Sequence, residues 1–327
     1  MQKWAIGVDL GGTKIEVALV NADGQLSDRL RIPTQSEAGP DKIPEDITKT
    51  IHQLCDKHKD IAPSVIGIGV AGQVEKNTGT IIFSPNLGWQ NVNLQELLTN
   101  KLQLPVAVCN DVKAAAWGEW LHGAGTGCDD LVCIFVGTGI GGAIVCNGRM
   151  LEGCNNTAGE IGHTTIQLNG PLCHCGNKGC FEALASGWAI ERDAQTAVQK
   201  NKDEGRMLLE MADGDAKLIT GAIVAAALQK GDALAAKLMY EVTDALIAGV
   251  TSVVNMVGPC RVILGGGVIE GMPELIKRVE AGVRKNALKA AIASVNILPA
   301  KLHNDSGVIG AAAFALHQQK KTVRYDD

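Results

Sequence analysis

The sequence predicts an α/β protein built from two similar lobes with a cleft between them. Residues 3–33 and residues 131–153 follow one plan, which is an apolar strand, a glycine-rich turn, a second strand and a closing turn. A copy in each half of the chain indicates a duplicated lobe, and each lobe would lend one glycine turn to the cleft. The 327 residues also exceed the usual size of a single hydrophobic core.

The remaining segments predict further helices and strands from their apolar spacing. Residues 84–89 form a loop, and no Pro- or Ser-rich linker separates domains, so a hinge would lie inside structured chain near Asp111 and Lys301. We expect helices over 43–59, 94–102, 112–121, 186–200, 220–230, 232–257, 273–288 and 307–318, and strands over 65–70, 105–109, 261–267 and 295–302.

The second glycine turn, residues 137–142, also fits the spacing of a dinucleotide-binding loop, G-x-G-x-x-G. That motif requires a helix directly after it, whereas residues 143–146 and the Asn147-Gly148 pair predict a strand and a hairpin turn. No G-K-[ST] follows a glycine cluster, which argues against a Walker P-loop. Three glycines end the strand at 261–267, a third place where backbone can lie flat against a ligand.

A cysteine-rich loop follows the second copy of the plan. Cys173 and Cys175 flank a single residue, and Cys180 follows after G-N-K-G, a spacing that suits a tetrahedral zinc site. His163 is favoured as the fourth ligand over His174, whose side chain in an extended C-x-C would point away from both sulfurs. The alternative is three reduced cysteines packed as small hydrophobic residues. The turn formers between them favour the metal.

Asp111 stands where a predicted strand ends and a helix begins. Ligand-facing groups of α/β sheets usually lie at such strand ends, but aspartate is also a good helix N-cap. This feature alone leaves both interpretations open.

Composition narrows the partners. A net charge of −5 gives no basic surface for nucleic acid or an anionic membrane, so small soluble partners are expected. No apolar stretch has the length of a membrane span, and the first one stops at Asp9, too short for a signal-peptide core. Seven of the ten cysteines are scattered outside the loop, which favours a reducing cytoplasm.

Several motifs together resemble the ROK family of sugar kinases and repressors. They are D-L-G-G-T-K (9–14), N-D (110–111), G-T-G-I-G-G (137–142), A-G-E-I-G-H (158–163) and C-H-C-G-N-K-G-C-F-E (173–182). The resemblance covers essentially the whole chain, and the C-x-C-G-x-x-G-C-x-E element is specific to that family. It implies a two-lobed actin/hexokinase-like ATPase fold, made of duplicated ribonuclease H-like domains with a zinc-binding loop, and ATP-dependent phosphorylation of a hexose.

By the same resemblance, residues 1–110 would form a small α/β lobe completed by the helix at 303–320, and residues 111–302 a large lobe with the zinc motif. Asp9 would hold the water shell of Mg²⁺, which prefers carboxylate and water ligands. The first phosphate loop would be Asp9, Gly11, Gly12, Thr13 and Lys14, the second Gly137, Thr138 and Gly139, and Gly265 and Gly266 would lie against the adenosine of ATP.

The resemblance makes Asp111 the catalytic base that accepts the proton of the attacking sugar hydroxyl. The zinc would be structural, with one ring nitrogen of His163 on the metal and the other toward the sugar. Lys113 stands where the family commonly has a short polar residue, and it either changes the surroundings of Asp111 or reaches solvent. The sugar ligands would be Asn110, Glu160, His163 and Glu182, with Gly72, Gln73, Asn86, Asp111 and Gly139 lining the same pocket.

Glucose is the favoured hexose, phosphorylated at the 6-hydroxyl, because S-P-N-L-G-W followed by N-V-N-L resembles the glucokinase branch. The alternative is an N-acetylmannosamine or N-acetylglucosamine kinase, in which nearly the same residues would read the hydroxyls. A sugar-responsive repressor is the third possibility, but family repressors carry a winged helix-turn-helix before the first glycine loop, and Asp9 comes too early for one. The family also implies a homodimer or homotetramer.

Overall fold

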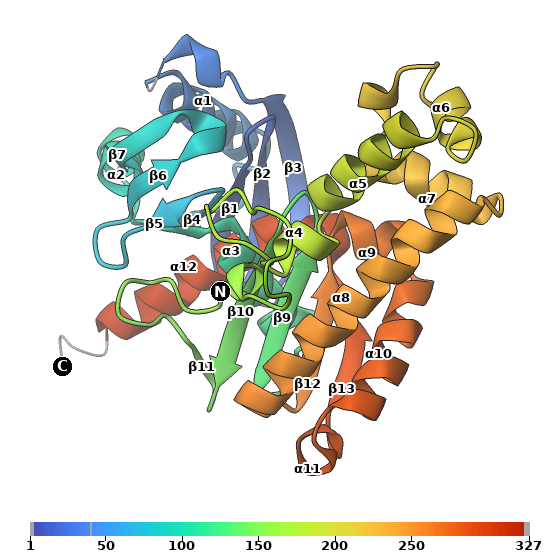
Figure 1. Cartoon of the computed structure of the whole chain (residues 1–327). Helices are drawn as coiled ribbons and strands as arrows, with labels where there is room; N and C mark the ends of the chain where they lie inside the picture. The colour runs from blue at the N-terminus through green and yellow to red at the C-terminus, as the bar shows by residue number, and fades with distance from the viewer. Residues whose placement is uncertain (1–2, 40, 324–327) are drawn as a thin grey trace. The chain divides into compact units, whose positions relative to one another are not determined.

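The computed structural model describes residues 3–39 and 41–323 (Figure 1). Contacts divide the chain into two compact units. The predicted lobe boundaries at residues 110 and 302 differ from these divisions, and the assignment of lobes stays a prediction. The first unit comprises Met1–Gly127, Leu151–Ala158 and Lys301–Asp327, and the second comprises Cys128–Met150 and Gly159–Ala300.

The first unit contains a five-stranded sheet of order β3-β2-β1-β4-β8. The β1–β2 and β2–β3 pairs are antiparallel, whereas β1–β4 and β4–β8 are parallel. The first predicted strand–turn–strand plan is thereby confirmed, with Gly11, Gly12 and Thr13 forming the turn. The strands are β1 (Trp4–Leu10), β2 (Lys14–Asn21), β3 (Leu26–Pro33), β4 (Pro63–Val70) and β8 (Val106–Asn110).

The second unit repeats this sheet, in the order β11-β10-β9-β12-β13. Strand β9 again pairs antiparallel with its successor β10 and parallel with β12, and β12 pairs parallel with β13. The duplication that the sequence predicted is therefore present down to the direction of every strand. The strands are β9 (Leu131–Val136), β10 (Ile140–Cys146), β11 (Arg149–Met150), β12 (Arg261–Gly265) and β13 (Asn296–Pro299).

Helices cover both faces of the first sheet. One core joins the strands to α1 (Lys42–Lys57) and α2 (Leu94–Leu102), and the other joins them to α12 (Ser306–Val323), which also packs on α3 (Asp111–His122). A Cβ on Gly7 would lie 1.9 Å from a carbonyl oxygen of α12. Glycine in the strand therefore lets the last helix of the chain rest directly on the first strand.

A buried carboxylate fixes the place where the chain returns to the first unit. Glu119 of α3 is fully buried and accepts hydrogen bonds from the amides of Ala124, Lys301 and Leu302, at 2.7–3.0 Å. These charge-assisted bonds hold the end of α3 and the entry to α12 together.

The long helix α8 (Ala233–Val257) is central to the second unit, whose core it shares with the sheet and with other helices (Figure 1). A left-handed Gly258 ends it, as helix C-termini prefer. The other helices are α4 (Glu182–Ala185), α5 (Gly187–Lys200), α6 (Arg206–Met211), α7 (Gly221–Gln229), α9 (Gly267–Gly271), α10 (Glu274–Asn286) and α11 (Lys289–Ile292).

The loop predicted at residues 84–89 connects two strands that the sequence did not predict. This segment contains a short 3₁₀ turn, Pro85–Leu87, between two strands of a small antiparallel sheet. Its strands are too short to give a clear period-two pattern, because each of them buries only one or two residues. The strands are β5 (Gln73–Val74), β6 (Thr80–Ser84) and β7 (Trp89–Asn93).

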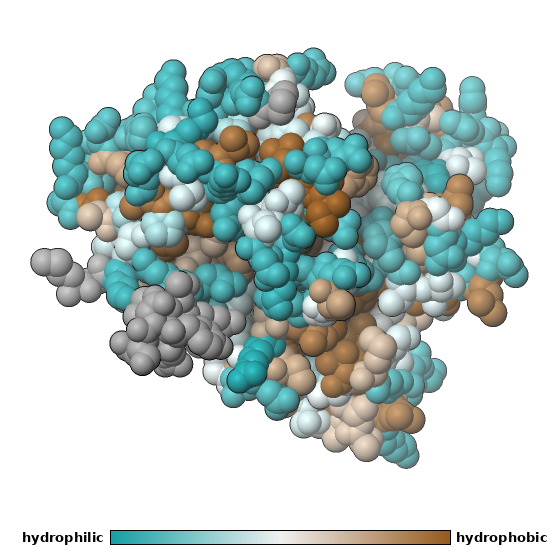
Figure 2. Space-filling model, turned by 90° about the vertical axis from the view of Figure 1, so that its left-hand side faces the viewer, coloured by the Kyte–Doolittle hydropathy of each residue, from teal (hydrophilic) through white to brown (hydrophobic). Residues whose placement is uncertain are grey.

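Within the described part of the chain, no helix has both the length and the hydropathy to cross a bilayer. On the face drawn in Figure 2, hydrophilic side chains surround smaller hydrophobic patches.

Candidate active site and metal centre

Asn110 and Asp111 lie together in the first unit, at the junction of β8 and α3. The side chain of Asn110, not that of Asp111, caps the helix, because its Oδ1 accepts hydrogen bonds from the amides of Val112 and Lys113. Its Nδ2 donates to Asp111 Oδ1 at 2.9 Å and to the carbonyl of Gly72 at 3.1 Å. Asp111 is therefore the first residue of the helix and not its N-cap, although its Oδ1 also accepts a hydrogen bond from the amide of Val112, and Asn110 orients its carboxylate.

Asp9 lies near the end of β1, and its carboxyl has an elevated pKa. Burial raises this pKa to about 6, and the negative charge of Asp111 adds to the effect. Lys14 acts in the opposite direction but is too weak to cancel these causes. Two carboxylates that repel each other in a partly buried place provide the oxygen ligands that a divalent cation prefers.

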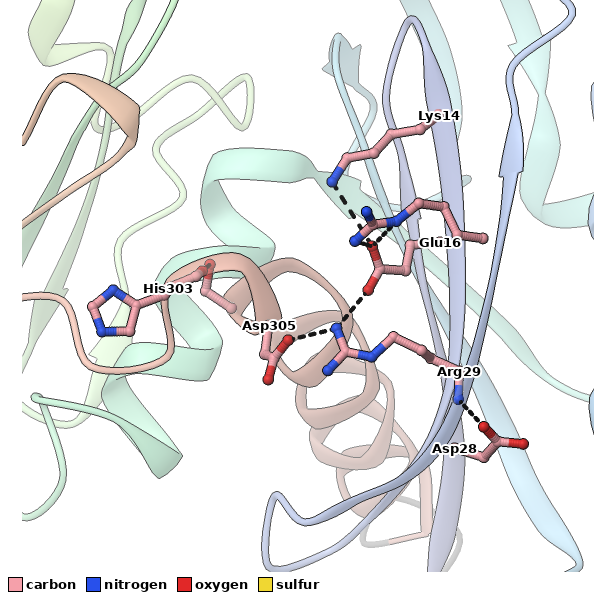
Figure 3. Close-up of polar contacts among 8 residues, drawn as sticks. Lys14, Glu16, Asp28, Arg29, His303 and Asp305 are labelled. Atoms are coloured by element: carbon pink, nitrogen blue, oxygen red, sulfur yellow. Dashed lines mark hydrogen bonds and ion pairs between the residues drawn. The ribbon is translucent and has the colours of Figure 1, made fainter. Parts of the chain in front are cut away.

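A charge network supports the strand opposite Asp9 (Figure 3). Glu16 on β2 is 1% exposed and binds Arg29 at 2.8 Å and Arg31 at 2.7 Å. Arg29 also reaches Asp305, just before α12, at 2.7 Å. Burial alone would raise the pKa of Glu16, but the two arginines lower it below its usual value. Glu16 is therefore ionised, and through Arg29 it links the first hairpin to Asp305, the residue before the last helix.

The first glycine turn is held by backbone and by β3. The amide of Gly11 donates to Lys14 O at 3.0 Å, and Thr34 bonds Gly11 O through its hydroxyl and Thr13 O through its amide. A Cβ on Gly12 would lie 3.0 Å from Cβ of Asn86. The structure thus brings Asn86, predicted to line the sugar pocket, against the predicted phosphate loop.

The second glycine turn is held by α5 and by Glu182. The carbonyls of Gly137 and Thr138 accept hydrogen bonds from the amides of residues 187 and 188, which begin α5. Glu182 Oε2 accepts a bond from Ile140 N at 2.8 Å, and a Cβ on Gly139 would lie 2.5 Å from this oxygen. The predicted sugar ligand Glu182 therefore also supports the predicted phosphate loop.

Gly265 ends β12 beside β9, and Gly266 follows it as the N-cap of α9. Gly266 has a φ of 89°, and a Cβ there would lie 2.6 Å from Val136 O. Only glycine fits this position without strain. Within the second unit, the third glycine segment thus adjoins the strand that leads into the turn at Gly137.

The A-G-E-I-G-H segment packs against β10. Ile161 enters the core of the second unit, and a Cβ on Gly162 would lie 2.0 Å from Ile140 O. Glu160, which precedes a short 3₁₀ turn (Ile161–His163), and His163, the last residue of that turn, are both exposed.

The four predicted metal ligands come together. The ligand atoms of His163, Cys173, Cys175 and Cys180 all lie within 4.8 Å of one another. The two sulfurs of Cys175 and Cys180 are 3.6 Å apart, and His163 Nδ1 is 3.7 Å from Cys173 Sγ. Two sulfurs bound to one tetrahedral zinc at about 2.3 Å would be about 3.8 Å apart, so the donor set fits this ion.

The loop around these ligands is rigidly attached. Phe181 is fully buried against α8, where Gly249 leaves room for its ring. His174 stacks on Trp188 of α5 with ring centroids 4.2 Å apart, so its ring is engaged outside the cluster. Trp188 Nε1 also donates to Glu182 Oε1 at 3.4 Å.

Of the two alternatives for Lys113, the structure excludes the one in which its side chain reaches solvent. Its side chain is 6% exposed, and Nζ donates to the carbonyl and to Oδ1 of Asn156, at 2.6 and 2.7 Å. Neither Asn156 nor Trp188 was singled out from the sequence. Only the unusual lysine beside Asp111 gave a signal that could have led to them.

Comparisons with known proteins agree with this geometry. The ROK family model matches residues 5–318. A glucokinase from Halalkalibacterium halodurans is 34% identical over 320 residues, 97% of this chain and 96% of the relative. An N-acetylmannosamine kinase from Escherichia fergusonii is 31% identical, with 95% of this chain and 97% of the relative covered.

Two solved structures have the same fold. A ROK family glucokinase from Streptomyces griseus in complex with glucose and AMPPNP superimposes with a TM-score of 0.80 at 31% identity, covering 96% of this chain and 99% of that one. A ROK hexokinase from Thermus thermophilus gives a TM-score of 0.84 at 30% identity, with coverage of 98% and 100%.

The duplicated sheets and the likeness to these structures define an actin/hexokinase-like fold. The chain belongs to the ROK family.

Proposed function

We propose that the chain is an ATP-dependent hexose kinase that phosphorylates the 6-hydroxyl of D-glucose. The observation that carries the proposal is the carboxylate of Asp111, held by Asn110 at a strand end in a chain 34% identical to a glucokinase. Phosphoryl transfer needs little covalent chemistry from the protein, so one oriented base and bound phosphates suffice.

Asp111 accepts the proton of the 6-hydroxyl, and the hydroxyl oxygen of the sugar forms a bond to the γ-phosphorus of ATP. The bond from this phosphorus to the β–γ bridging oxygen breaks, and ADP leaves. Asn110 keeps the base in place by donating to Asp111 Oδ1 and to Gly72 O. A positioned base of this kind contributes about 10²- to 10⁴-fold to the rate.

The two glycine turns bind the phosphates of ATP. Amides of Gly12, Thr13, Thr138 and Gly139 are the donors we assign to phosphate oxygens, and Gly11, whose amide already donates to Lys14 O, shapes the first turn. Gly265 and Gly266 accommodate the adenosine. Asp9 and the neighbouring charge of Asp111 suit a magnesium ion, which neutralises phosphate charge when bound.

We assign the reading of the sugar hydroxyls to four polar side chains. Asn110 contributes an amide, Glu160 and Glu182 contribute carboxylates, and His163 contributes the ring nitrogen that does not face the thiols. Gly72, Gln73 and Asn86 line the pocket. Such fixed donors and acceptors reject sugars that leave them unpaired.

We assign zinc to the cluster of His163 and the three cysteines. Four protein ligands would close a tetrahedral shell, so the role is structural. The loop that it fixes carries Glu182, whose carboxylate also holds the amide of Ile140.

A coupled assay of ADP release tests the function. Purified protein with intact metal is given ATP, Mg²⁺ and one of glucose, mannose, fructose, N-acetylglucosamine or N-acetylmannosamine. We expect the largest kcat/KM with glucose. Sugar binding without ADP release would point to a repressor-like sensor, and neither binding nor turnover would overturn the proposal.

The second candidate is N-acetylmannosamine kinase. The relative from Escherichia fergusonii supports it, because 31% identity over 95% of this chain is close to that of the glucokinases. A kcat/KM for N-acetylmannosamine above that for glucose in the same assay would favour this function.

We also propose that the enzyme is a cytoplasmic homo-oligomer. None of the ten cysteines, all of which lie in the described part of the chain, forms a disulfide, which agrees with a reducing compartment. Light scattering coupled to size-exclusion chromatography tests the assembly, with a dimer or tetramer expected and a monomer as the contrary result.

A further inference from the structure

A buried lysine clamps a separate segment of chain to the helix that carries Asp111. Lys113 Nζ donates to both the carbonyl and the Oδ1 of Asn156. Asn156 Nδ2 in turn donates to Val74 O at 2.9 Å. We call Lys113, Asn156 and the Val74 carbonyl the Lys113 clamp, and all three lie within the first unit.

The Lys113 clamp is a buried contact and not an incidental contact at the surface. Burying an ammonium is costly unless hydrogen bonds replace its hydration, and Lys113 is only 6% exposed. Asn156 has a φ of 59°, a left-handed conformation that asparagine tolerates better than most residues. Removing the ammonium would leave two acceptors of the half-buried Asn156 without their donor.

The clamp reaches segments that carry proposed sugar ligands. Asn110 bonds Gly72 O directly, and the clamp bonds Val74 O, so side chains linked to the start of α3 hold both ends of the Gly72–Val74 segment. Asn156 also lies only four residues before Glu160 in the chain. One lysine therefore ties the helix of the proposed base to two other sugar-facing segments.

We propose that Lys113 is a positioning residue for the sugar site, acting through Asn156 on the Gly72–Val74 segment and on the approach to Glu160. The inference rests on the proposed kinase function and deepens it. Because the clamp bonds converge on sugar-facing segments, sugar affinity depends on it and nucleotide affinity does not. Lys113 thereby performs in this chain a task that a short polar residue at its position has no reach to perform.

The test separates sugar binding from nucleotide binding. Lys113→Met keeps the length of the side chain and removes the donor. Titration calorimetry with glucose should show at least tenfold weaker binding, whereas AMPPNP binding without sugar should stay within twofold of wild type. In steady-state kinetics, KM for glucose should rise more than kcat falls.

Lys76→Met is the matched control. Lys76 is half-exposed and pairs with Glu152 of the same segment at 2.6 Å, so the variant removes a lysine contact without touching the clamp. Exposed ion pairs contribute little, and glucose affinity should stay within twofold.

Asn156→Gly is the second variant, for the case that Lys113→Met does not fold. Glycine keeps the left-handed backbone and removes the bond to Val74, and glucose binding should weaken several-fold. Glucose affinity within twofold of wild type in the folded variants, even with lowered thermal stability, would overturn the inference alone. A wild-type protein that binds none of the sugars would overturn the proposed function and the inference with it.

Discussion

The two sheets have the same strand order and directions, yet they bring carboxylates to their glycine turns in different ways. In the first unit the acids are local, since Asp9 ends β1 and Glu16 faces it across the hairpin. In the second unit the two pairs nearest the turn are Val136 with Ile140 and Phe135 with Gly141, so neither strand carries an acid there. The carboxylate there comes from Glu182, which follows the cysteine loop and bonds Ile140 N.

This difference shows that two copies of one fold can place a carboxylate beside a glycine turn in different ways, from the strands themselves or from a separate loop. The first turn carries its own charges, so its electrostatics depend on neighbouring strands. The second turn is bonded by a carboxylate from the cysteine loop, so its geometry depends on the fold of that loop and on the ion that we propose for it. The first unit should therefore be sensitive to pH and the second to chelation.

The largest effect should come from the base in the first unit. Asp111→Asn removes the proton acceptor while keeping the bonds to Asn110 and Val112 within reach, and kcat should fall about 10³-fold. Glucose affinity, measured by calorimetry, should change little.

Glu182→Gln should do the reverse, raising KM for glucose more than it lowers kcat. If Asp111→Asn and Glu182→Gln changed kcat and KM equally, the different roles proposed for these two carboxylates would be contradicted.

Loss of the metal should affect only the second turn. Cys175→Ser should lower bound zinc, measured by atomic absorption, and reduce the free energy of unfolding by about 3 kcal/mol or more. Hydrogen exchange at Ile140 should accelerate, whereas exchange at Gly11 should not. Cys260→Ser changes an exposed thiol outside the cluster and serves as control. Unchanged zinc content would remove Cys175 from the ligand set.

Asp9 should make the magnesium-free protein less stable as pH rises. The folded state holds this proton more tightly than the unfolded chain, with pKa values of about 6 and 3.8, so the penalty grows between these values and is complete above them. At pH 8, Asp9→Asn should stabilise the protein by an amount on the order of 2 to 3 kcal/mol, at about 1.4 kcal/mol per pKa unit.

Near pH 3.5 the same substitution should be almost neutral, because Asp9 is then protonated in both states. Urea unfolding of wild type and variant across this range measures the difference. A stabilisation by Asp9→Asn that did not depend on pH would show that the carboxyl is not the titrating group. Millimolar Mg²⁺ should stabilise the wild type more than the variant.

The smallest effect should come from Glu16. The pKa of this carboxyl is lowered in the folded protein, so its stabilisation is present above the unfolded value of 4.5 and is lost as pH falls through the folded value. Glu16→Gln should cost about 1 to 2 kcal/mol at pH 7, since both arginine partners are partly exposed. Glu37→Gln, at an exposed position, is the control. If Glu16→Gln cost the same free energy of unfolding at pH 3 as at pH 7, an ionised Glu16 would be contradicted.

The helices with clear apolar spacing were predicted within a few residues, for example the expected helix at 232–257 against Ala233–Val257. The small sheet β5–β7 was not, because its strands are short and half-exposed. The metal ligands could be predicted because three of them are close in the sequence. Lys113 drew notice as unusual, but its partner lies 43 residues away and nothing local marks it.

The amino-acid sequence by itself determined the two glycine turns, the duplicated strand plan and the thiol cluster, since each depends on residues a few positions apart. The tertiary structure decided which distant groups meet, including Glu182 with Ile140, Lys113 with Asn156, and the last helix with the first strand. Spacing and periodicity report only on local conformation. Contacts between remote segments depend on how buried surfaces pack, and no local pattern encodes that packing.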